Sequence, residues 1–288
     1  MSYTIGSFNM YKWGEKSSKN LLKLVEIIKD NHLDIVAFQE VYNADQIEEL
    51  CKWLRTWDYK FGVPSGSPKS EGYAYIWNTR KFHLSETRNG KPNPVIVEKY
   101  RIENDIEISG IRRPPYYIKL TSNILDRFEI RLINVHLRHN KVVTDTPSRL
   151  EQRYQEYRII AESILRRISN EPEMNKSFVA VMLGDYNMTK SQIDSRNIVI
   201  GYGNDTGSKI INLQDEYTTL SNNEQNPNEI YSTNDYDHFT FNEKNIETIK
   251  QFSVERIDAI KDFYANERDK YKSELSDHVP IKITVDIK

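Results

Sequence analysis

Residues 178–187, which read FVAVMLGDYN, are the stretch that decides the fold class. Six apolar residues in a row precede Gly184, and a run without alternation is typical of a strand buried on both faces. Asp185 and Asn187 follow two positions apart, so an extended chain would point both side chains the same way. Reactive groups in α/β proteins often lie at such a rim, but Gly-Asp-x-Asn is also common in turns. The stretch alone leaves both interpretations open.

Strand patterns recur along the rest of the chain. They cover residues 3–9, 34–40, 59–63, 73–78, 94–99, 116–121, 128–137, 236–241 and 280–287. Amphipathic helices are expected after the first strand, with Ser17 or Ser18 as the cap, and over residues 44–55 and 150–168. No repeat or linker divides the chain, so one domain spanning residues 1–288 is expected. This mixture favours an α/β or α+β fold with two sheets packed face to face.

Composition and charge exclude some classes of protein. The net charge of −2 excludes a strongly basic nucleic-acid coat protein, although a nuclease needs only a local positive surface. Residues 110–141 hold seven Lys and Arg against two acids, which indicates a basic surface or a solvated strand edge. The single cysteine, Cys51, excludes an intramolecular disulfide and a cysteine-based zinc site. It lies on an apolar helical stripe, which predicts a buried, inert thiol.

The N-terminal residues lack the basic start and long apolar core of a signal peptide. No apolar run approaches the roughly 18 residues of a membrane span. A cytoplasmic location without a membrane span is therefore expected.

Polar or ionisable residues stand beside several of these strand patterns. They are Asn9, Glu40, His136, Asp185, Asn187, Asp237, Asp277 and His278. Strand ends are often polar because they meet water, but a set of carboxylates, amides and two histidines is harder to explain in that way. Hard oxygen ligands without sulfur suit Mg²⁺ or Mn²⁺ rather than zinc, and Mg²⁺ is commonly shared with substrate phosphates. The set therefore indicates phosphate-ester chemistry.

Seven motifs in order carry a family resemblance. They are SFNMYKW (7–13), DIVAFQEV (34–41), RRPPYYIKL (112–120), INVHL (133–137), MLGDYN (182–187), YDHFTF (236–241) and SDHVPIKITV (276–285). Together they resemble the endonuclease/exonuclease/phosphatase superfamily, and within it the deoxyribonuclease I-like branch. The resemblance implies a four-layer αββα sandwich, with two mixed β-sheets flanked by helices and a cleft at one rim.

The resemblance also implies roles for single residues. Glu40, Asn9 and Asp277 match the metal region, and His136 and His278 match the histidines that flank the scissile phosphate. Glu71 and Asp237 stand where the partners of these two histidines are expected, because such a carboxylate fixes the tautomer of a histidine and stabilises imidazolium. Asp185 and Asn187 match the pair that orients water and binds phosphate. Arg113, or in a less favoured register Arg112, matches a phosphate-contacting arginine.

The implied activity is a divalent-metal-dependent phosphodiester hydrolase that uses Mg²⁺ or Mn²⁺. Asp185 or a His–carboxylate pair would deprotonate the attacking water, while Asn187, Arg113 and a protonated histidine would stabilise the developing charge. The sequence leaves the choice of base open.

DNA is the favoured substrate because residues 110–141 are basic. RNA, a phosphorylated small molecule and an inositol-lipid phosphate are the alternatives. Tyr42 replaces the arginine that enters the minor groove in the secreted deoxyribonuclease, which weakens that mode of binding. A catalytically inactive binding module is less favoured, because the residues of the site are all present. A monomer without a partner protein is expected.

Overall fold

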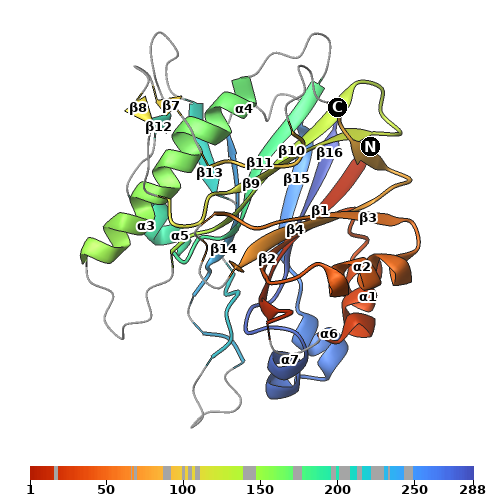
Figure 1. Cartoon of the computed structure of the whole chain (residues 1–288). Helices are drawn as coiled ribbons and strands as arrows, with labels where there is room; N and C mark the ends of the chain where they lie inside the picture. Colours follow the sequence, from red (N-terminus) through yellow and green to blue (C-terminus); the bar gives the residue numbers. More distant parts are fainter. Residues whose placement is uncertain are drawn as a thin grey trace.

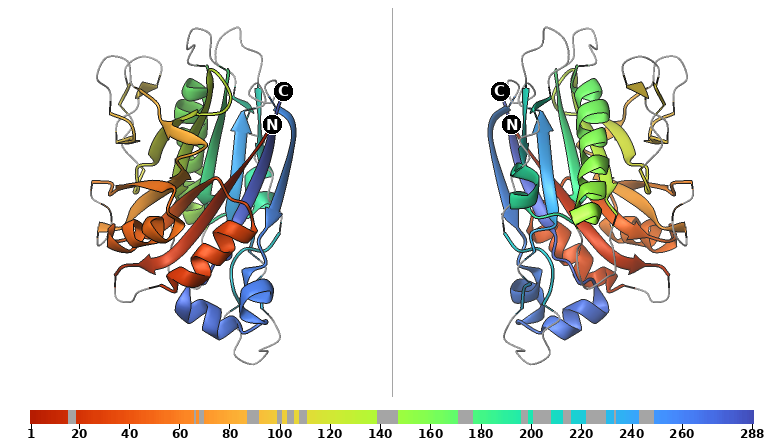
Figure 2. Two further views of the ribbon diagram at one scale, coloured as in Figure 1. Left: turned by 90° about the vertical axis from the view of Figure 1, so that its right-hand side faces the viewer. Right: turned by 90° about the vertical axis from the view of Figure 1, so that its left-hand side faces the viewer.

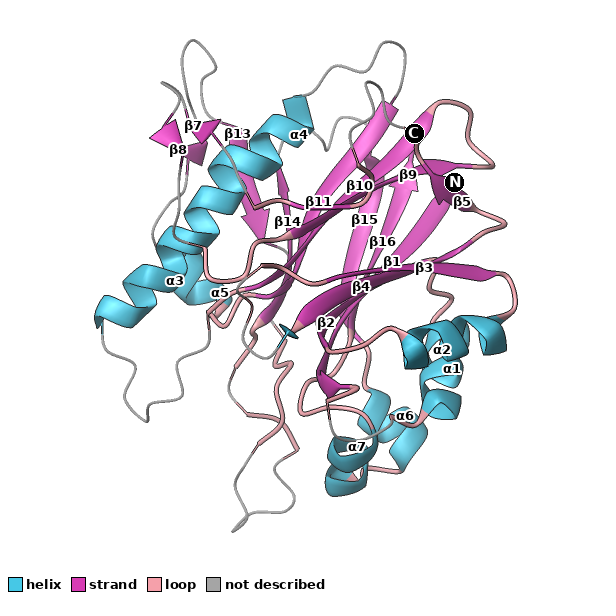
Figure 3. Cartoon of the chain, viewed as in Figure 1, coloured by secondary structure: helices cyan, strands magenta, loops and turns pink. Residues whose placement is uncertain are grey.

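The computed structural model describes residues 1–15, 19–65, 67, 70–86, 92–98, 101–102, 106–107, 111–138, 147–170, 177–195, 199–200, 208–212, 216–221, 230–232, 234–242 and 249–288. Within these residues, two large sheets pack face to face and helices cover their outer faces (Figure 1). Figure 3 separates the helices from the strands in the same view.

The first sheet has six strands in the order β15-β16-β1-β2-β4-β3. Their bounds are β1 (Ser2–Trp13), β2 (Ile35–Val41), β3 (Trp57–Gly62), β4 (Gly72–Asn78), β15 (Ile249–Arg256) and β16 (Ile281–Ile287). β1 runs parallel to β2 and antiparallel to β16.

The second sheet has eight strands, in the order β12-β13-β14-β11-β10-β9-β5, with β6 also paired to β9. Their bounds are β5 (Phe82–Leu84), β6 (Val95–Ile96), β9 (Tyr116–Ser122), β10 (Phe128–His136), β11 (Ser177–Asp185), β12 (Val199–Ile200), β13 (Ser208–Asn212) and β14 (Asp237–Asn242). The parallel pair β10–β11 lies at its centre, as the apolar run of β11 indicated. A separate two-stranded sheet joins β7 (Arg101–Ile102) and β8 (Ile106–Glu107).

The helices form the two outer layers. α1 (Leu21–Asp30), α2 (Asp45–Leu54), α6 (Ala259–Tyr264) and α7 (Arg268–Glu274) share an apolar core with the first sheet. α3 (Pro147–Ile159), the π-helical turn η3 (Ile160–Leu165), α4 (Arg166–Asn170) and α5 (Lys190–Asp194) lie on the second sheet. The two turned views in Figure 2 show the sheets between these layers. The predicted four-layer αββα sandwich is therefore confirmed.

Local details differ from the sequence prediction at α1. The N-cap of this helix is Asn20, whose side chain accepts a hydrogen bond from Lys23 N at 3.1 Å. The predicted caps Ser17 and Ser18 lie outside the described residues. Cys51 is buried on the inner face of α2, as predicted, and burial raises the pKa of its thiol to about 12. Among the helices the structure describes, none is long and apolar enough to span a membrane.

Strand alternation leads directly from the core to the rim of the sheets. In β11, Val179, Val181 and Leu183 pack between the sheets, and the next inward position is Asp185. In β10 the inward row likewise continues from apolar residues to Asn134 and His136. The inward rows of several strands therefore change from apolar to polar at the same end of the sandwich.

A layer of amides separates the apolar core from this polar end. Gln39 Nε2 donates to Asn134 Oδ1 at 2.7 Å and to Ser7 Oγ at 3.2 Å, which joins the two sheets. Asn134 Nδ2 donates to Phe38 O at 2.9 Å. Hydrogen bonds to fully buried amides fix their orientation, so this layer sets the register between the two sheets.

Candidate active site

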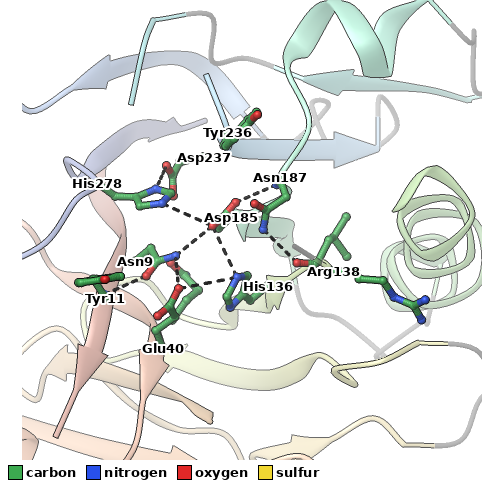
Figure 4. A network of polar contacts seen from close by, with 12 residues as sticks. Asn9, Tyr11, Glu40, His136, Arg138, Asp185, Asn187, Tyr236, Asp237 and His278 are labelled. Atoms are coloured by element: carbon green, nitrogen blue, oxygen red, sulfur yellow. Dashed lines mark hydrogen bonds and ion pairs between the residues drawn. The ribbon is translucent and has the colours of Figure 1, made fainter. Parts of the chain in front are cut away.

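The polar ends of both sheets converge on one carboxylate, Asp185 (Figure 4). Asp185 is 2% exposed, and its Oδ2 accepts a hydrogen bond from Asn9 Nδ2 at 2.9 Å. His136 Nε2 and His278 Nε2 lie 3.6 Å and 3.7 Å from the same oxygen. Burial opposes ionisation of Asp185, but His278 and His136 outweigh it and hold the pKa of the carboxyl below its ordinary value. Asp185 is therefore a carboxylate between two imidazoles.

The GDYN segment lies at the rim of the second sheet, and the chain turns there. Gly184 has a φ of 136°, and a Cβ at this position would lie 2.0 Å from Val135 O, so only glycine fits. Asn187 also has a positive φ, 50°, and its backbone N–H donates to Asp185 Oδ1 at 2.8 Å. Of the two interpretations that the sequence left open, the turn holds after Asp185, although Asp185 itself ends the buried strand at the rim. The Asn187 side chain instead donates to Leu137 O at 3.0 Å.

His136 forms the first histidine–carboxylate pair. Its Nδ1 lies 2.5 Å from Glu71 Oε1, and the same carboxylate oxygen lies 3.0 Å from Arg113 Nε. Arg113 also donates from Nη1 to Leu137 O at 3.3 Å. Burial and Arg113 lower the pKa of His136, but Glu71 and Asp185 outweigh them and raise it. Burial opposes the charge of Glu71, yet His136 and Arg113 hold its pKa below the ordinary value.

His278 forms the second pair, with Asp237. Its Nδ1 lies 2.8 Å from Asp237 Oδ2; His278 precedes β16 of the first sheet, and Asp237 begins β14 of the second. Burial opposes protonation of His278, but Asp237 and Asp185 raise its pKa well above the ordinary value. Burial also raises the pKa of Asp237, against the effect of His278. Each imidazole thus has one nitrogen on its own carboxylate and the other facing Asp185.

Two hydroxyl groups that the sequence did not single out hold the second pair. Ser276 Oγ donates to Asn9 O at 2.6 Å and accepts a hydrogen bond from His278 N at 3.1 Å. Thr218 Oγ1 accepts from Tyr236 N at 3.1 Å and from Asp237 N at 3.2 Å. Ser276 stands next to Asp277 in the SDH motif, which is a usable signal. Thr218 has no such signal, because only tertiary folding brings it to Asp237.

The predicted metal region lies where β1 and β2 both depart from regular geometry. Tyr11, Lys12 and Glu40 have positive φ angles of 43°, 60° and 56°. Glu40 Oε2 accepts from Lys12 N at 3.1 Å, and Glu40 Oε1 lies 3.3 Å from Asn9 Nδ2. Left-handed backbone at non-glycine residues is costly and is often found at functional sites. The irregular turn of β1 thus holds Glu40 at the rim.

Asp277 lies near the predicted metal region, since both Asp277 and Glu40 act on the charge of Lys19. Among the described residues, no direct contact joins Asp277 to Glu40. Asp277 Oδ1 is buried and has no hydrogen-bond partner among the described residues. Lys19, which sequence reasoning missed, lies near both carboxylates; burial lowers its pKa to about 8, against the effect of Asp277 and Glu40.

The donor set can be tested against a metal ion. In the described part of the chain, no three His, Cys, Asp or Glu side chains form a ready-made metal cluster. Two carboxylates and an amide nevertheless suit Mg²⁺, which keeps several water ligands, and the orphaned Asp277 oxygen has a lone pair available. The residues present therefore fit a hydrated, oxygen-ligated cation better than a fully enclosed one.

Part of the positive charge expected over residues 110–141 is held in internal ion pairs. Arg131 is fully buried and pairs with Glu129 at 3.1 Å, and Arg138 pairs with Glu156 at 3.2 Å. Arg113 is engaged by Glu71, whereas Arg112 is exposed. Gly110 and residues 139–141 lie outside the described residues. Arg131 is buried because β10 is covered on both faces, whereas Arg112 and Arg127 are exposed, so only part of the segment contributes to a basic surface.

Tyr42 lies at the edge of the site and is half-buried. Burial, Glu71 and Glu40 raise its pKa.

Solved structures of three other proteins share this fold. TDP2 from D. rerio, in complex with a single strand DNA product, is 15% identical with a TM-score of 0.61 over 99% of each chain. The mannosyl-6-phosphatase Bt3783 of Bacteroides thetaiotaomicron is 15% identical, with a TM-score of 0.57 over 98% of this chain and 99% of that one. ANGEL2, a 2′,3′-cyclic phosphatase, is 13% identical, with a TM-score of 0.60 over 99% of this chain and 95% of that one.

At these identities the likeness establishes a shared fold. Comparison with curated protein sequences finds no match. The sequence itself matches the Endonuclease/Exonuclease/phosphatase family over residues 6–278, nearly its whole length. The resemblance carried by the seven motifs is therefore confirmed, and the chain belongs to the Endonuclease/Exonuclease/phosphatase family.

Proposed function

We propose that this protein is a divalent-metal-dependent phosphodiester hydrolase whose substrate is DNA. The observation that carries the proposal is the convergence of two histidine–carboxylate pairs on Asp185, at 3.6 Å and 3.7 Å. A lone histidine–carboxylate pair is common in proteins, but two pairs facing one buried carboxylate can move protons on both sides of a bound phosphate. The D. rerio TDP2 structure, which contains a single strand DNA product, supports DNA as the substrate.

Asp185 is the base in this mechanism. Glu71 and Asp185 raise the pKa of His136, and Asp237 and Asp185 raise the pKa of His278, so both imidazoles favour the protonated form and are weaker candidates for the base than Asp185. Asp185 is ionised, and the backbone N–H of Asn187 fixes its Oδ1. A water held by Asp185 attacks phosphorus in line with the leaving group and transfers its proton to the carboxylate.

His278 is the acid. Its Nε2 carries a proton, and Asp237 stabilises the imidazolium from the other side of the ring. As the ester P–O bond breaks, this proton passes to the leaving oxygen, which departs as an alcohol. The proton on Asp185 then returns to His278 Nε2, 3.7 Å away, and restores the starting state.

The first pair positions charge at the phosphate. Glu71 orients both the His136 imidazolium and the Arg113 guanidinium, so that two cations lie side by side at the rim. Preorganised cations of this kind stabilise charge that develops on phosphate oxygens. Glu40, Asn9 and Asp277 would hold a divalent cation, which when bound supplies further neutralisation of that charge.

A second candidate activity is hydrolysis of a phosphorylated small molecule. Two proteins of the same fold are a mannosyl-6-phosphatase and a 2′,3′-cyclic phosphatase. Ion pairs with Glu129 and Glu156 also engage Arg131 and Arg138, which reduces the positive charge that residues 111–138 offer to a polyanion. RNA and an inositol-lipid phosphate remain further alternatives on the same residues. A binding module without activity is disfavoured by the complete set of ionisable groups around Asp185.

Nicking of supercoiled plasmid tests the proposal. The protein is incubated with Mg²⁺, with Mn²⁺ and with EDTA, beside a His278→Ala variant of unchanged circular dichroism. Metal-dependent nicking that the variant loses is the expected result. Equal nicking by the folded His278→Ala protein would rule out His278 as the acid. Absence of nicking by the wild type, with turnover of a sugar phosphate or a cyclic phosphate, would favour the second candidate.

A further inference from the structure

A cavity opens beside the candidate metal region, between the end of β1 and helix α7. It has a volume of about 360 Å³, and its lining includes Tyr11, Lys12 and Lys19 on one side and Lys272 and Ser273 on the other. We call it the Tyr11 pocket. Cavities that bind small ligands have volumes of roughly 300–1,000 Å³. The pocket is therefore large enough for a nucleoside or another unit of similar size.

The backbone of the Tyr11 pocket is also the backbone that holds the metal region. Tyr11 N donates to Asn9 Oδ1 at 3.0 Å, and Lys12 N donates to Glu40 Oε2 at 3.1 Å. Both residues are left-handed, with φ angles of 43° and 60°. This conformation directs the two N–H groups to the site while the two side chains line the pocket. A ligand that spans the two places would thus contact both surfaces of one strained turn.

The residues that line the Tyr11 pocket suit a nucleobase and a phosphate group. Lys12 Nζ and Lys19 Nζ lie over the Tyr11 ring, 4.9 Å and 5.8 Å from its centre. Lys19 is only 7% exposed, and its ammonium donates one recorded hydrogen bond, to Tyr11 O at 2.8 Å. An ammonium has three donors, so Lys19 retains capacity for an anionic oxygen. A nucleobase that stacks on this ring would take the place of an ammonium group above it, and the displaced ammonium could bind the adjacent phosphate.

The acids of the lining limit how much negative charge it accepts. Glu15 and Asp269 also face the Tyr11 pocket, against three lysines. The pocket therefore suits a single phosphate with a neutral, stackable group better than a dense polyanion. Carboxylates at the wall can also accept hydrogen bonds from the N–H groups of a base or the hydroxyl groups of a sugar.

We propose that the Tyr11 pocket is a subsite for the nucleotide next to the scissile phosphate, with its base stacked on Tyr11 and its outer phosphate on Lys12 and Lys19. The subsite rests on the proposed phosphodiesterase function, because its occupant is the neighbouring unit of the same substrate. It would make the enzyme read at least one nucleotide beyond the bond that it cleaves.

Direct binding tests the pocket independently of turnover. Thymidine 3′,5′-bisphosphate and its abasic analogue, 2-deoxyribose 3,5-bisphosphate, are titrated into the wild type, Tyr11→Leu, Lys12→Met and the control Lys52→Met by calorimetry. Lys52 lies on the outer surface of α2, where it pairs with Glu48. Stacking on one aromatic ring is expected to strengthen binding of the thymidine compound about tenfold over the abasic one. Tyr11→Leu should remove this difference, and Lys12→Met should weaken both ligands.

Equal binding of the two ligands by the wild type would overturn the stacking role of Tyr11. Binding that Tyr11→Leu and Lys12→Met leave at the level of Lys52→Met would overturn the subsite as a whole.

Turnover separates failure of the subsite from failure of the proposed function. The ratio of kcat/KM for thymidine 5′-(4-nitrophenyl phosphate) to that for bis(4-nitrophenyl) phosphate should fall about tenfold in Tyr11→Leu. An unchanged ratio in an active enzyme would refute the subsite while leaving the hydrolase intact. If the wild type cleaves neither ester, the proposed function fails, and the calorimetric comparison alone decides the pocket.

Discussion

Replacement of Glu71 by glutamine separates the charge of this carboxylate from its shape. Glu71 Oε1 lies 2.5 Å from His136 Nδ1 and 3.0 Å from Arg113 Nε, so one oxygen serves two cations. The side chains of Glu71, His136 and Arg113 are 6%, 3% and 10% exposed, so solvent screens these contacts little. In Glu71→Gln the amide oxygen can still accept a hydrogen bond, but the negative charge between the cations is gone.

The expected loss follows from this burial. Removing one partner of a buried ion pair costs about 3–5 kcal/mol, and the hydrogen bond that glutamine retains returns about 1 kcal/mol. We therefore expect the free energy of unfolding at neutral pH to fall by roughly 2–4 kcal/mol, which lowers Tm by about 3–7 °C. Loss of one preorganised charge-stabilising group costs about 10²–10³-fold in rate, so kcat/KM should fall within that range.

The difference in stability should depend on pH in a defined way. The pKa of Glu71 is lowered on folding, so its stabilising effect is complete above its ordinary value of 4.5 and disappears as pH falls through the folded value. The pKa of His136 is raised, so its contribution is complete below its ordinary value of 6.5 and disappears as pH rises through the folded value. The free energies of unfolding of the wild type and Glu71→Gln should therefore differ most between pH 4.5 and pH 6.5. The difference should shrink at lower and at higher pH.

Urea unfolding across this pH range, with kcat/KM measured on the same samples, checks the prediction. Glu129→Gln is the matched control, because Glu129 forms an equally buried pair with Arg131, at 3.1 Å, away from the rim. It should lose stability to a similar extent and keep its turnover. The reasoning would be refuted if Glu71→Gln retained wild-type kcat/KM, or if both variants lost activity in proportion to their stability.

Three further outcomes are expected. Asp237→Asn removes the carboxylate that helps to raise the pKa of His278, so the alkaline limb of the kcat/KM profile should move to lower pH; an unmoved limb would exclude His278 as its source. Glu156, which accepts from Arg112 N at 3.0 Å and Arg138 N at 3.1 Å, ties the loop of Arg113 to the end of β10. Glu156→Ala should thus destabilise the fold by about 3 kcal/mol and raise KM more than it lowers kcat, whereas Glu156→Gln should recover part of both losses. Mg²⁺ or Mn²⁺ at a hundred times its Kd should stabilise the wild type by about 2.7 kcal/mol in thermal unfolding. Glu40→Gln should lose most of that gain, and an equal gain would place the cation elsewhere.

Sequence patterns located the central strands well, for a physical reason. β11 is buried on both faces and β16 on alternate positions, and both patterns are visible in single sequences. β15 (IKQFSVER) was missed because it is an edge strand, and the row that packs on the core has only two neighbouring apolar residues, Phe252 and Val254, both half-buried. α6 and α7 have six and seven residues, too few for a helical period to stand out.

Some residues of the candidate site could likewise be predicted from the sequence, and others could not. Asp185 and His136 directly follow or end an apolar strand, so their place at a rim could be read from the chain. Lys19 and Thr218 could not be found in this way, since both sit in irregular segments. Their position beside Asp277 and Asp237 depends on contacts between parts of the chain more than 15 residues apart.

Two of the contacts at the site bridge the sheets rather than lie within one. Asn9 of the first sheet donates to Asp185 of the second, and His278 beside the first holds Asp237 of the second. A slide of one sheet over the other by about one ångström would spare every hydrogen bond inside each sheet and still misplace these groups, at a cost of about a hundredfold in rate. The catalytic rate therefore depends on how accurately the two sheets are aligned. Damage to the amide layer that keeps the sheets in register would be visible as lost activity while the protein is still fully folded.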